Sequence, residues 1–444
     1  MNAPREATPP TVPARDKQGG EVAGRPAGAE PGVWTERMLT ALTGGMKGNR
    51  RFSLIDKVYA DRTLELAWAK VRSNAGGSGV DGITIERFAK GCPRGLLDLK
   101  EQLRTASYQP RPVKRVWIPK PGTNERRPLG IPAVRDRIVQ TALRLVIEPI
   151  FEHQFAEHSY GFRPGRGCKD ALRRVQTLLD EGSTWIVDAD LKGYFDTIPK
   201  DRLMGRVEER IADSRVLALL RSYLDQGVME ELTLHEPSER GTPQGAVISP
   251  LLANLYLDPL DHLLAAAGWQ MVRYADDFVI LCRSEDEAKA ALACVQTWVQ
   301  NHGLMLHPEK TRIVDATLPG GFDFLGYHFE RGYRWPRRKA MDRLKDKVRA
   351  LTPRTSGVAL EVTITRLNEV LRGWFGYFQH SHCTTFPTLD SYIRGRLRSI
   401  LRKRRGGRGR GQGTDHRRWR NHYFAELGLF NLTQAHALAG QSPR

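Results

Sequence analysis

The chain has 444 residues, of which 40% are hydrophobic and 27% charged, so it is long enough for two to four globular domains. No apolar run approaches the roughly 18 residues of a transmembrane helix. Its five cysteines are never closer than 12 residues apart, which argues against a disulfide framework and against a C-x-x-C zinc site. The net charge of +19 is uneven, because residues 331–444 hold 25 Lys and Arg against 7 Asp and Glu. This asymmetry favours nucleic acid over an anionic membrane as the partner.

The N-terminal third is predicted to begin with a tail and to continue with helices. Residues 1–33 contain 17 Ala, Pro or Gly and no Leu, Ile or Phe, which predicts a disordered tail and no secretory signal. Apolar residues with i, i+3, i+4, i+7 spacing predict a helix over 64–71, which ends at the Gly-rich loop 74–79. The same spacing predicts a second helix over 139–146, before Pro149.

The central part mixes strands and helices irregularly. Residues 118–132 are predicted to form a hairpin that carries cations around its turn. Residues 185–191 are rich in β-formers and run into acids, and residues 271–282 are two short apolar runs around a polar turn. Small residues in the segment 241–252 open another helix and permit close backbone approach. This irregular order indicates the α+β class.

The last quarter is helical and basic. One apolar stripe runs over 367–378. Arg394, Arg398 and Arg402 are spaced four residues apart beside a second apolar stripe, which predicts a helix that packs on one side and presents guanidinium groups on the other. The Arg- and Gly-rich run 402–411 is typical of RNA-binding sequences.

Three acids are the candidates for chemistry. Asp276 and Asp277 stand at the predicted turn of the hairpin 271–282, and Asp190 ends the strand-like segment 185–191. Adjacent carboxylates repel one another unless a cation lies beside them, and carboxylates from separate strands are the ligands that divalent ions share with substrate phosphates. An isolated Asp-Asp pair is more often a solvated turn, so the dipeptide alone decides little.

The surrounding blocks resemble the reverse transcriptases encoded by bacterial group II introns. The similarity runs in order from about Phe52 to Leu432. Its blocks are GVDG at 79–82, IPK at 118–120, RPLGIP at 127–132, SYGFRP at 159–164, DLKGYFD at 190–196, TPQG at 242–245, YADD at 274–277, EKT at 309–311, FDFLG at 322–326 and LRGWF at 371–375.

This resemblance implies an α+β right-hand polymerase, with fingers and palm, followed by a helical, basic thumb or maturase domain. The expected divisions are a disordered tail at 1–33, an N-terminal extension and start of the fingers at 34–110, fingers and palm at 111–330, a thumb/maturase domain at 331–400 and a basic nucleic-acid-binding segment at 401–444.

The resemblance also implies metal ligands. Asp190 and Asp276 would bind two Mg²⁺ ions, or Mn²⁺ in their place, with Asp277 as the third acid and the Leu191 carbonyl assisting. All three acids are present, which disfavours the hypothesis that the protein is an RNA chaperone with a vestigial polymerase site.

Other site residues follow from the same blocks. Phe195 would lie under the sugar and exclude a ribose 2′-OH, unless it is simply core. Lys120 and Arg127 would hold the triphosphate, unless they are surface charges, and Gln244 would contact the nucleotide near its sugar. Lys310 would support the primer or form a structural salt bridge. The thumb arginines 394, 398 and 402 would bind primer and template.

The implied function is RNA-directed DNA synthesis from deoxynucleoside triphosphates, on an RNA template with a DNA primer. The implied partners are the parent group II intron RNA, whose splicing and mobility the protein would assist, and target DNA, in the bacterial cytoplasm or at the nucleoid and without a membrane. Charge alone does not separate specific intron binding from a general grip on a duplex. We expect no endonuclease module, since no C-x-x-C follows the thumb. The sequence leaves monomer and homodimer open, and a domesticated reverse transcriptase with a host role, such as phage defence, is the alternative.

Overall fold

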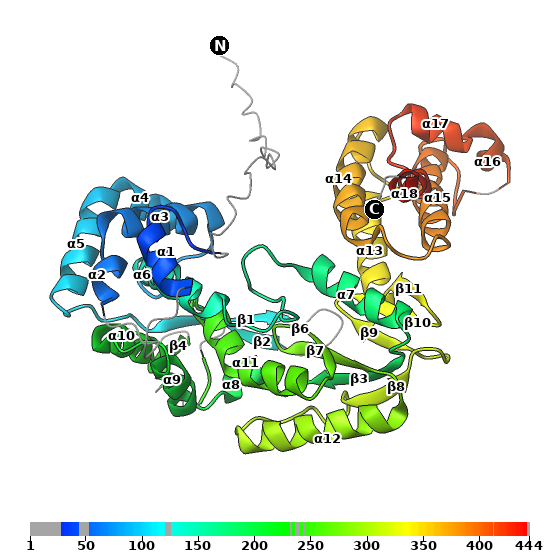
Figure 1. The fold of residues 1–444 in the computed structure, drawn as a ribbon. Coiled ribbons are helices and arrows are strands. Elements are labelled where there is room, and N and C mark those ends of the chain that lie inside the picture. The colour runs from blue at the N-terminus through cyan, green and yellow to red at the C-terminus, as the bar shows by residue number, and fades with distance from the viewer. Residues whose placement is uncertain are drawn as a thin grey trace, which may run out of the picture.

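The structure is a computed structural model that describes residues 28–43, 53–119, 126–230, 233–235, 240–242, 245–411 and 413–441. Figure 1 shows N-terminal helices on one side, a sheet-containing palm in the middle and a helical thumb that stands apart from the N-terminal helices. The predicted α+β class and right-hand polymerase arrangement are confirmed. Over these residues, no helix combines the length and apolarity needed to cross a membrane.

The N-terminal helices pack around α6 (Val134–Glu152), which is buried along most of its length. The helix predicted over 64–71 is confirmed as part of α3, whose apolar face lies against α6. The bounds of this group are α1 (Glu36–Thr43), α2 (Ile55–Val58), α3 (Asp61–Asn74), α4 (Ile85–Lys90) and α5 (Cys92–Arg104).

The segment before α1 supports α6 at a proline. The helix predicted before Pro149 is confirmed, but it continues through this proline to Glu152. Proline has no N–H, so the carbonyl of Leu145, four residues earlier, loses its helical donor. The buried Trp34 indole donates a hydrogen bond to this carbonyl over 3.1 Å. The N-terminal segment therefore replaces the hydrogen bond that the proline removes.

The folded chain begins earlier than the tail boundary expected at 33. Residues 28–33 form turns, and Ala29 and Val33 are buried in the main core. Residues 1–27 lie outside the described residues, so the rest of that prediction stays a prediction.

The fingers contain a four-stranded sheet of order β2-β1-β4-β5. The hairpin predicted over 118–132 is confirmed by the antiparallel pairing of β1 with β2, and its turn lies outside the described residues. The strands are β1 (Val113–Pro119), β2 (Arg126–Ile131), β4 (Val228–Glu230) and β5 (Thr233–His235).

The palm sheet has the order β6-β7-β3-β8 and carries both predicted acidic segments. The predicted strand is β3 (Trp185–Asp190), and the predicted hairpin is β6 (Gln270–Tyr274) with β7 (Asp277–Cys282). Apolar side chains on one face pack against α11 (Ser249–Ala266) and α12 (Glu285–Asn301) in the main core. The fourth strand is β8 (Arg312–Asp315), and the connecting helices are α8 (Tyr194–Thr197), α9 (Lys200–Glu208) and α10 (Ser214–Leu224).

A second core covers the other face of the palm sheet. Ile186 of β3 and Val279 and Leu281 of β7 pack there against α7 (Cys168–Asp180) and a small sheet of order β11-β10-β9. The strands of that sheet are β9 (Phe322–Phe324), β10 (Tyr327–Glu330) and β11 (Tyr333–Pro336). The three acids at one end of the palm sheet are half-buried.

The thumb is a helical bundle with a core of its own. The expected boundary at 400/401 falls inside α15, and the segment beyond it folds back onto α14 and α15 through Trp419, Phe424 and Leu432. The basic C-terminal segment is therefore part of the thumb. The helices are α13 (Arg338–Leu351), α14 (Leu360–Phe378), α15 (Thr385–Arg404), α16 (Thr414–Arg418), α17 (Asn421–Glu426) and α18 (Leu432–Gln441).

Candidate active site

The β6–β7 hairpin holds two of the predicted acids. Tyr274 pairs with Asp277, so Ala275 and Asp276 form a two-residue loop. Ala275 has φ +61°, a conformation that hairpin loops usually assign to glycine. A non-glycine residue in this region costs on the order of 1–3 kcal/mol. The turn is therefore strained and must be held in place by its neighbours.

The third acid joins the same end of the sheet. β3 pairs antiparallel with β7, and Asp190 lies directly opposite Asp277. Asp276 is adjacent in the turn, so the structure brings all three predicted acids together.

The electrostatics of this cluster favour a cation. Burial, with repulsion from Asp190, raises the pKa of Asp276. Burial, with repulsion from Asp188 and the other two acids, raises the pKa of Asp277 to about 7. The ammonium of Lys310 lies 2.6 Å from Oδ2 of Asp190. These acids crowd negative charge into a partly buried space, and positive charge beside them relieves the repulsion.

The donor chemistry fits divalent metal ions. The cluster offers carboxylate oxygens, which Mg²⁺ prefers, and Mg²⁺ is usually held by one or two carboxylates together with substrate phosphates. In the described part of the chain, no three His, Cys, Asp or Glu side chains converge closely enough to form a complete metal site by themselves. The two expected Mg²⁺ sites therefore stay a prediction, in which substrate phosphates would supply the ligands that the acids do not.

The predicted SYGFRP block lies against the strained turn. A Cβ added to Gly161 would stand 2.2 Å from the backbone nitrogen of Ala275, so only glycine permits this approach. The Tyr160 N–H donates to the carbonyl of Arg273 over 2.8 Å. This block is thus a wall of the active site.

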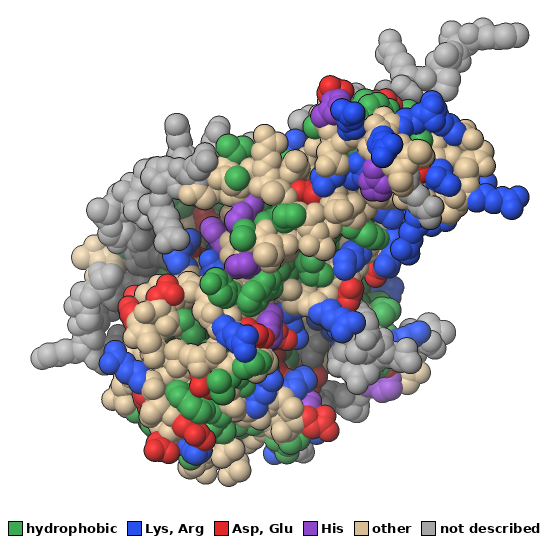
Figure 2. All heavy atoms as spheres, turned by 90° about the vertical axis from the view of Figure 1, so that its right-hand side faces the viewer, with side chains coloured by type: hydrophobic (Ala, Val, Ile, Leu, Met, Phe, Trp, Pro, Cys, Tyr) green, Lys and Arg blue, Asp and Glu red, His purple; other side chains and the backbone are tan. Residues whose placement is uncertain are grey.

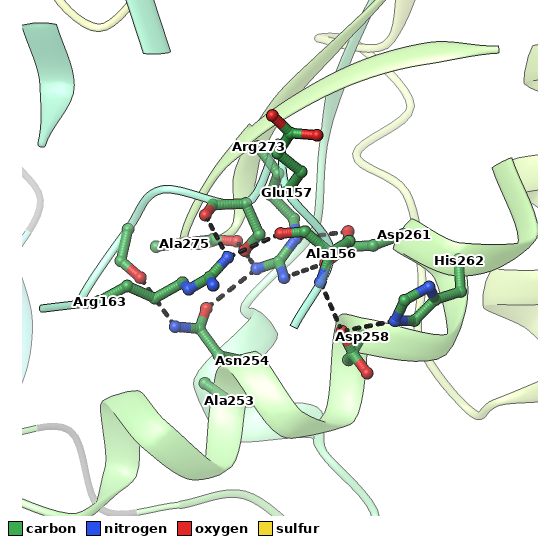
Figure 3. A network of polar contacts seen from close by, with 12 residues as sticks. Ala156, Glu157, Arg163, Ala253, Asn254, Asp258, Asp261, His262, Arg273 and Ala275 are labelled. Atoms are coloured by element: carbon green, nitrogen blue, oxygen red, sulfur yellow. Dashed lines mark hydrogen bonds and ion pairs between the residues drawn. The ribbon is translucent and has the colours of Figure 1, made fainter. Parts of the chain in front are cut away.

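A buried arginine ties the turn to α11, as Figure 3 shows. Arg273 has no exposed surface, and its Nε donates to Asp261 over 2.7 Å. Its Nη1 donates to the Ala275 carbonyl over 2.9 Å and to Asn254 Oδ1 over 3.0 Å. Asn254 in turn donates to the carbonyl of Gly161 over 2.7 Å. The guanidinium therefore links α11 with the turn before Asp276, and Asn254 extends the link to the glycine wall.

Sequence reasoning missed this network. Burial alone would lower the pKa of Arg273, but the ion pair with Asp261 offsets burial and raises it, so the side chain stays charged. The sequence signal for this network was Arg273 itself, a cation inside the apolar strand that precedes the turn. Its partners lie on a helix elsewhere in the chain, and no local pattern connects them.

Described residues of three predicted blocks, DLKGYFD, TPQG and RPLGIP, contact one another. Phe195 is half-buried on α8, with its ring edge-on to Tyr194 at 5.5 Å, and its carbonyl accepts a hydrogen bond from the Thr242 N–H over 2.7 Å. A Cβ added to Gly245 would stand 2.3 Å from the carbonyl oxygen of Gly130 in β2. Of the TPQG block, Gly245 thus packs closely against the RPLGIP strand and Thr242 is tied to the Phe195 helix.

The remaining nucleotide-binding predictions stay untested. Arg127 is exposed on β2, opposite Ile118. Lys120 and Gln244 lie outside the described residues. Leu191 is buried, and the role of its carbonyl as a metal ligand stays a prediction.

Two of the three thumb arginines are structural, which corrects the primer–template prediction. Arg398 is buried; its Nε donates to the Trp419 carbonyl over 3.0 Å and its Nη2 to Asn421 Oδ1 over 2.8 Å. Arg402 Nη1 lies 2.6 Å from Asp415 Oδ2. The predicted solvent face of α15 is covered by the chain that follows it, so these guanidinium groups hold the fold together.

The other two primer–template predictions are open. Arg394 is half-buried, and its Nε has no hydrogen-bond partner among the described residues. Lys310 forms the salt bridge that the sequence left open as one alternative. Its side chain is 61% exposed, and contact with a primer stays a prediction.

Comparisons with known proteins agree with the geometry. Residues 118–329 match the family described as reverse transcriptase (RNA-dependent DNA polymerase), and residues 341–422 match the group II intron maturase-specific domain. The chain is 35% identical to the protein YkfC of Escherichia coli over 292 residues, which cover 57% of this chain and 76% of YkfC.

Two further matches each cover less than half of the matched protein. The chain is 36% identical to the group II intron-encoded protein LtrA of Lactococcus lactis over 201 residues, which cover 45% of this chain but 33% of LtrA. A solved chain of a partial Cas6-RT-Cas1--Cas2 complex shares 26% identity over 58% of this chain and 43% of its own length, with a TM-score of 0.36. By its similarity to YkfC and its two matched domains, the chain belongs to the family of group II intron reverse transcriptases with a maturase domain.

Proposed function

We propose that the protein is an RNA-directed DNA polymerase that extends a DNA primer along an RNA template. The primer 3′-oxygen attacks the α-phosphorus of a deoxynucleoside triphosphate, a new phosphodiester bond forms, and pyrophosphate leaves. The observation that carries this proposal is the meeting of Asp190, Asp276 and Asp277 at one end of the palm sheet.

The acids would hold two divalent ions, Mg²⁺ in the cell and Mn²⁺ as a substitute. Asp190 and Asp276 are the proposed ligands of both ions, with Asp277 and the Leu191 carbonyl beside them. Bound there, the ions supply Lewis-acid activation of the attacking oxygen and charge stabilisation of the leaving pyrophosphate. Asp276 depends for its position on the network of Arg273, because the turn is strained.

The nucleotide would lie between the palm acids and the fingers. Phe195 is the proposed floor under the sugar, where a half-buried ring leaves no space for a 2′-hydroxyl. Arg127 and Lys120 would bind the triphosphate, since a guanidinium can hold two oxygens at once, and Gln244 would contact the nucleotide near its sugar.

The thumb suits a second role, in which the protein binds its parent intron RNA and assists splicing and mobility at target DNA. The match of residues 341–422 to the maturase-specific domain supports this role, as does the net charge of +18 over 331–444. The proposed location is the bacterial cytoplasm, and the nucleoid when target DNA is bound.

The test is primer extension by the full chain and by Asp276→Asn, which keeps the shape of the side chain and removes its charge. We expect synthesis to fall at least 10³-fold while RNA affinity stays within about twofold, because the charge acts on the reacting phosphates. Asp286→Asn, at an exposed position of α12, is the matched control and should extend primers normally. Equal loss of RNA affinity and synthesis in Asp276→Asn would contradict the assignment.

A further inference from the structure

A cavity of about 730 Å³ lies between α7, the β10–β11 hairpin and the loop that follows α14. These elements lie on the right of Figure 1, the side that faces the viewer in Figure 2. Of the predicted site residues that the structure describes, none lines this cavity. Its volume is within the range of about 300–1,000 Å³ in which proteins enclose ligand-sized groups. We call it the α7 groove.

The α7 groove is electropositive. Lys169, Arg173 and Arg334 line it against one acid, Asp180. Arg173 also pairs with an acid of its own helix, but that pair is exposed and therefore weak. Burial, together with the nearby Arg334 and Lys169, lowers the pKa of His380 in the same groove. The groove therefore disfavours additional positive charge and favours a negatively charged group.

The rim of the groove carries exposed aromatic surface in a fixed position. The Tyr333 side chain is 55% exposed. Its ring stands edge-on to His382 at 4.8 Å, and Trp335 lies 5.9 Å from Tyr333 and 5.5 Å from His382. The next residue of the strand, Arg334, is anchored by its Nε, which donates to the His380 carbonyl over 2.9 Å. The ring is thus held by its neighbours while much of its surface faces solvent.

We propose that the α7 groove binds an unpaired stretch of RNA, with a base stacked on Tyr333 and phosphates beside Lys169 and Arg173. Aromatic rings alternating with cations are the chemistry that holds single strands, whereas the bases of a duplex are already stacked and do not offer a free face. The groove borders the thumb, whose Lys and Arg side chains crowd the upper part of the molecule in Figure 2. The end of α14 and the loop after it line the groove, so the groove is continuous with the domain proposed to bind RNA. This inference rests on the proposed RNA-binding function.

The first test measures the affinity of the full chain for a fluorescent oligoadenylate RNA of about 12 nucleotides, within the usual span of single-strand sites. Tyr333→Ala should weaken binding by about fivefold or more, since a stacked base is lost, while Tyr333→Phe keeps the ring and should bind as the original chain does. Unchanged affinity in Tyr333→Ala, or equal weakening in Tyr333→Phe, overturns the proposal.

The second test removes one positive charge inside or outside the groove. Lys169→Ala should lower the slope of log affinity against log salt by about 0.7, as expected for one lost phosphate contact on a single strand. Lys289→Ala makes the same change at a position of α12 where the side chain is 58% exposed, and it should leave the slope unchanged. Equal slopes for the two variants overturn the proposal.

Primer extension separates this inference from the proposed function. If the original chain extends primers but the groove variants bind RNA normally, the groove assignment fails and the polymerase stands. If the original chain does not extend primers, while Tyr333→Ala still loses RNA affinity, the polymerase assignment fails and the groove stands.

Discussion

Removal of the Arg273 guanidinium should damage stability and catalysis by separable routes. In Arg273→Met, the carboxylate of Asp261 stays buried without its partner, because the Asp261 side chain is only 3% exposed. An unpaired buried charge of this kind costs about 3–5 kcal/mol of unfolding free energy. The Ala275 carbonyl loses its donor at the same time, so the strained turn is released beside Asp276.

The double variant Arg273→Met, Asp261→Leu separates the two effects. Replacement of both partners by apolar side chains of similar volume removes the buried charge, and such replacements are often neutral or stabilising. We expect its unfolding free energy to return to within about 2 kcal/mol of the original chain. The Ala275 carbonyl still has no donor, however, so the turn stays released.

The catalytic effect should therefore persist in the double variant. A displacement of about 1 Å at reacting groups costs on the order of 10²-fold in rate. We expect kcat for primer extension to fall by this factor in both variants, at a temperature where circular dichroism shows each to be folded. Arg206→Met, which breaks a partly exposed pair with Glu209 on the helix surface, should change stability by less than about 1 kcal/mol and leave kcat unchanged. Recovery of kcat together with stability in the double variant would refute a positioning role for Arg273.

Four further variants test other parts of the structure. Gly161→Ala drives a methyl group into the Ala275 backbone and should reduce primer extension more than tenfold, whereas Gly373→Ala, in open space on α14, should raise unfolding free energy by about 0.5–1 kcal/mol. Arg398→Ala should lower unfolding free energy in urea by about 1–3 kcal/mol because buried hydrogen bonds are lost; loss of RNA affinity without destabilisation would restore the original primer–template assignment. Phe195→Ala should admit ribonucleotides about 10–200-fold better relative to deoxynucleotides, measured by competitive incorporation, and unchanged discrimination would place the ring in the core.

Local sequence patterns were sufficient to predict the hairpin that carries Asp276 and Asp277. Two short apolar runs around a polar turn predict paired strands, and the pairing of β6 with β7 confirms it. The sequence does not show that Asp190 lies opposite Asp277, because that register joins strands separated by α8 to α11. The family resemblance implied that the three acids lie close together, and the structure adds the register that places Asp190 opposite Asp277.

Non-local contacts explain where the patterns fall short. Pro149 normally predicts the end of a helix, yet the indole of Trp34 satisfies the carbonyl that this proline leaves without a donor. The two residues are far apart in sequence, so the partner is visible only in the fold. The same segment carries the buried Ala29 and Val33, and its composition of small residues and prolines gave no sign of burial.

The thumb shows why charge on a helix face does not identify a binding surface. The period of four among the α15 arginines is real, and it does separate them from the apolar stripe. Periodicity reports which side chains share a face, but it does not report what later covers that face. Residues 413–424 return over α15, so that Arg398 and Arg402 hold Trp419 and Asp415 in place. Side chains that remain exposed in the fold are the better candidates for RNA contacts, and in the α7 groove Tyr333 and Lys169 meet that condition.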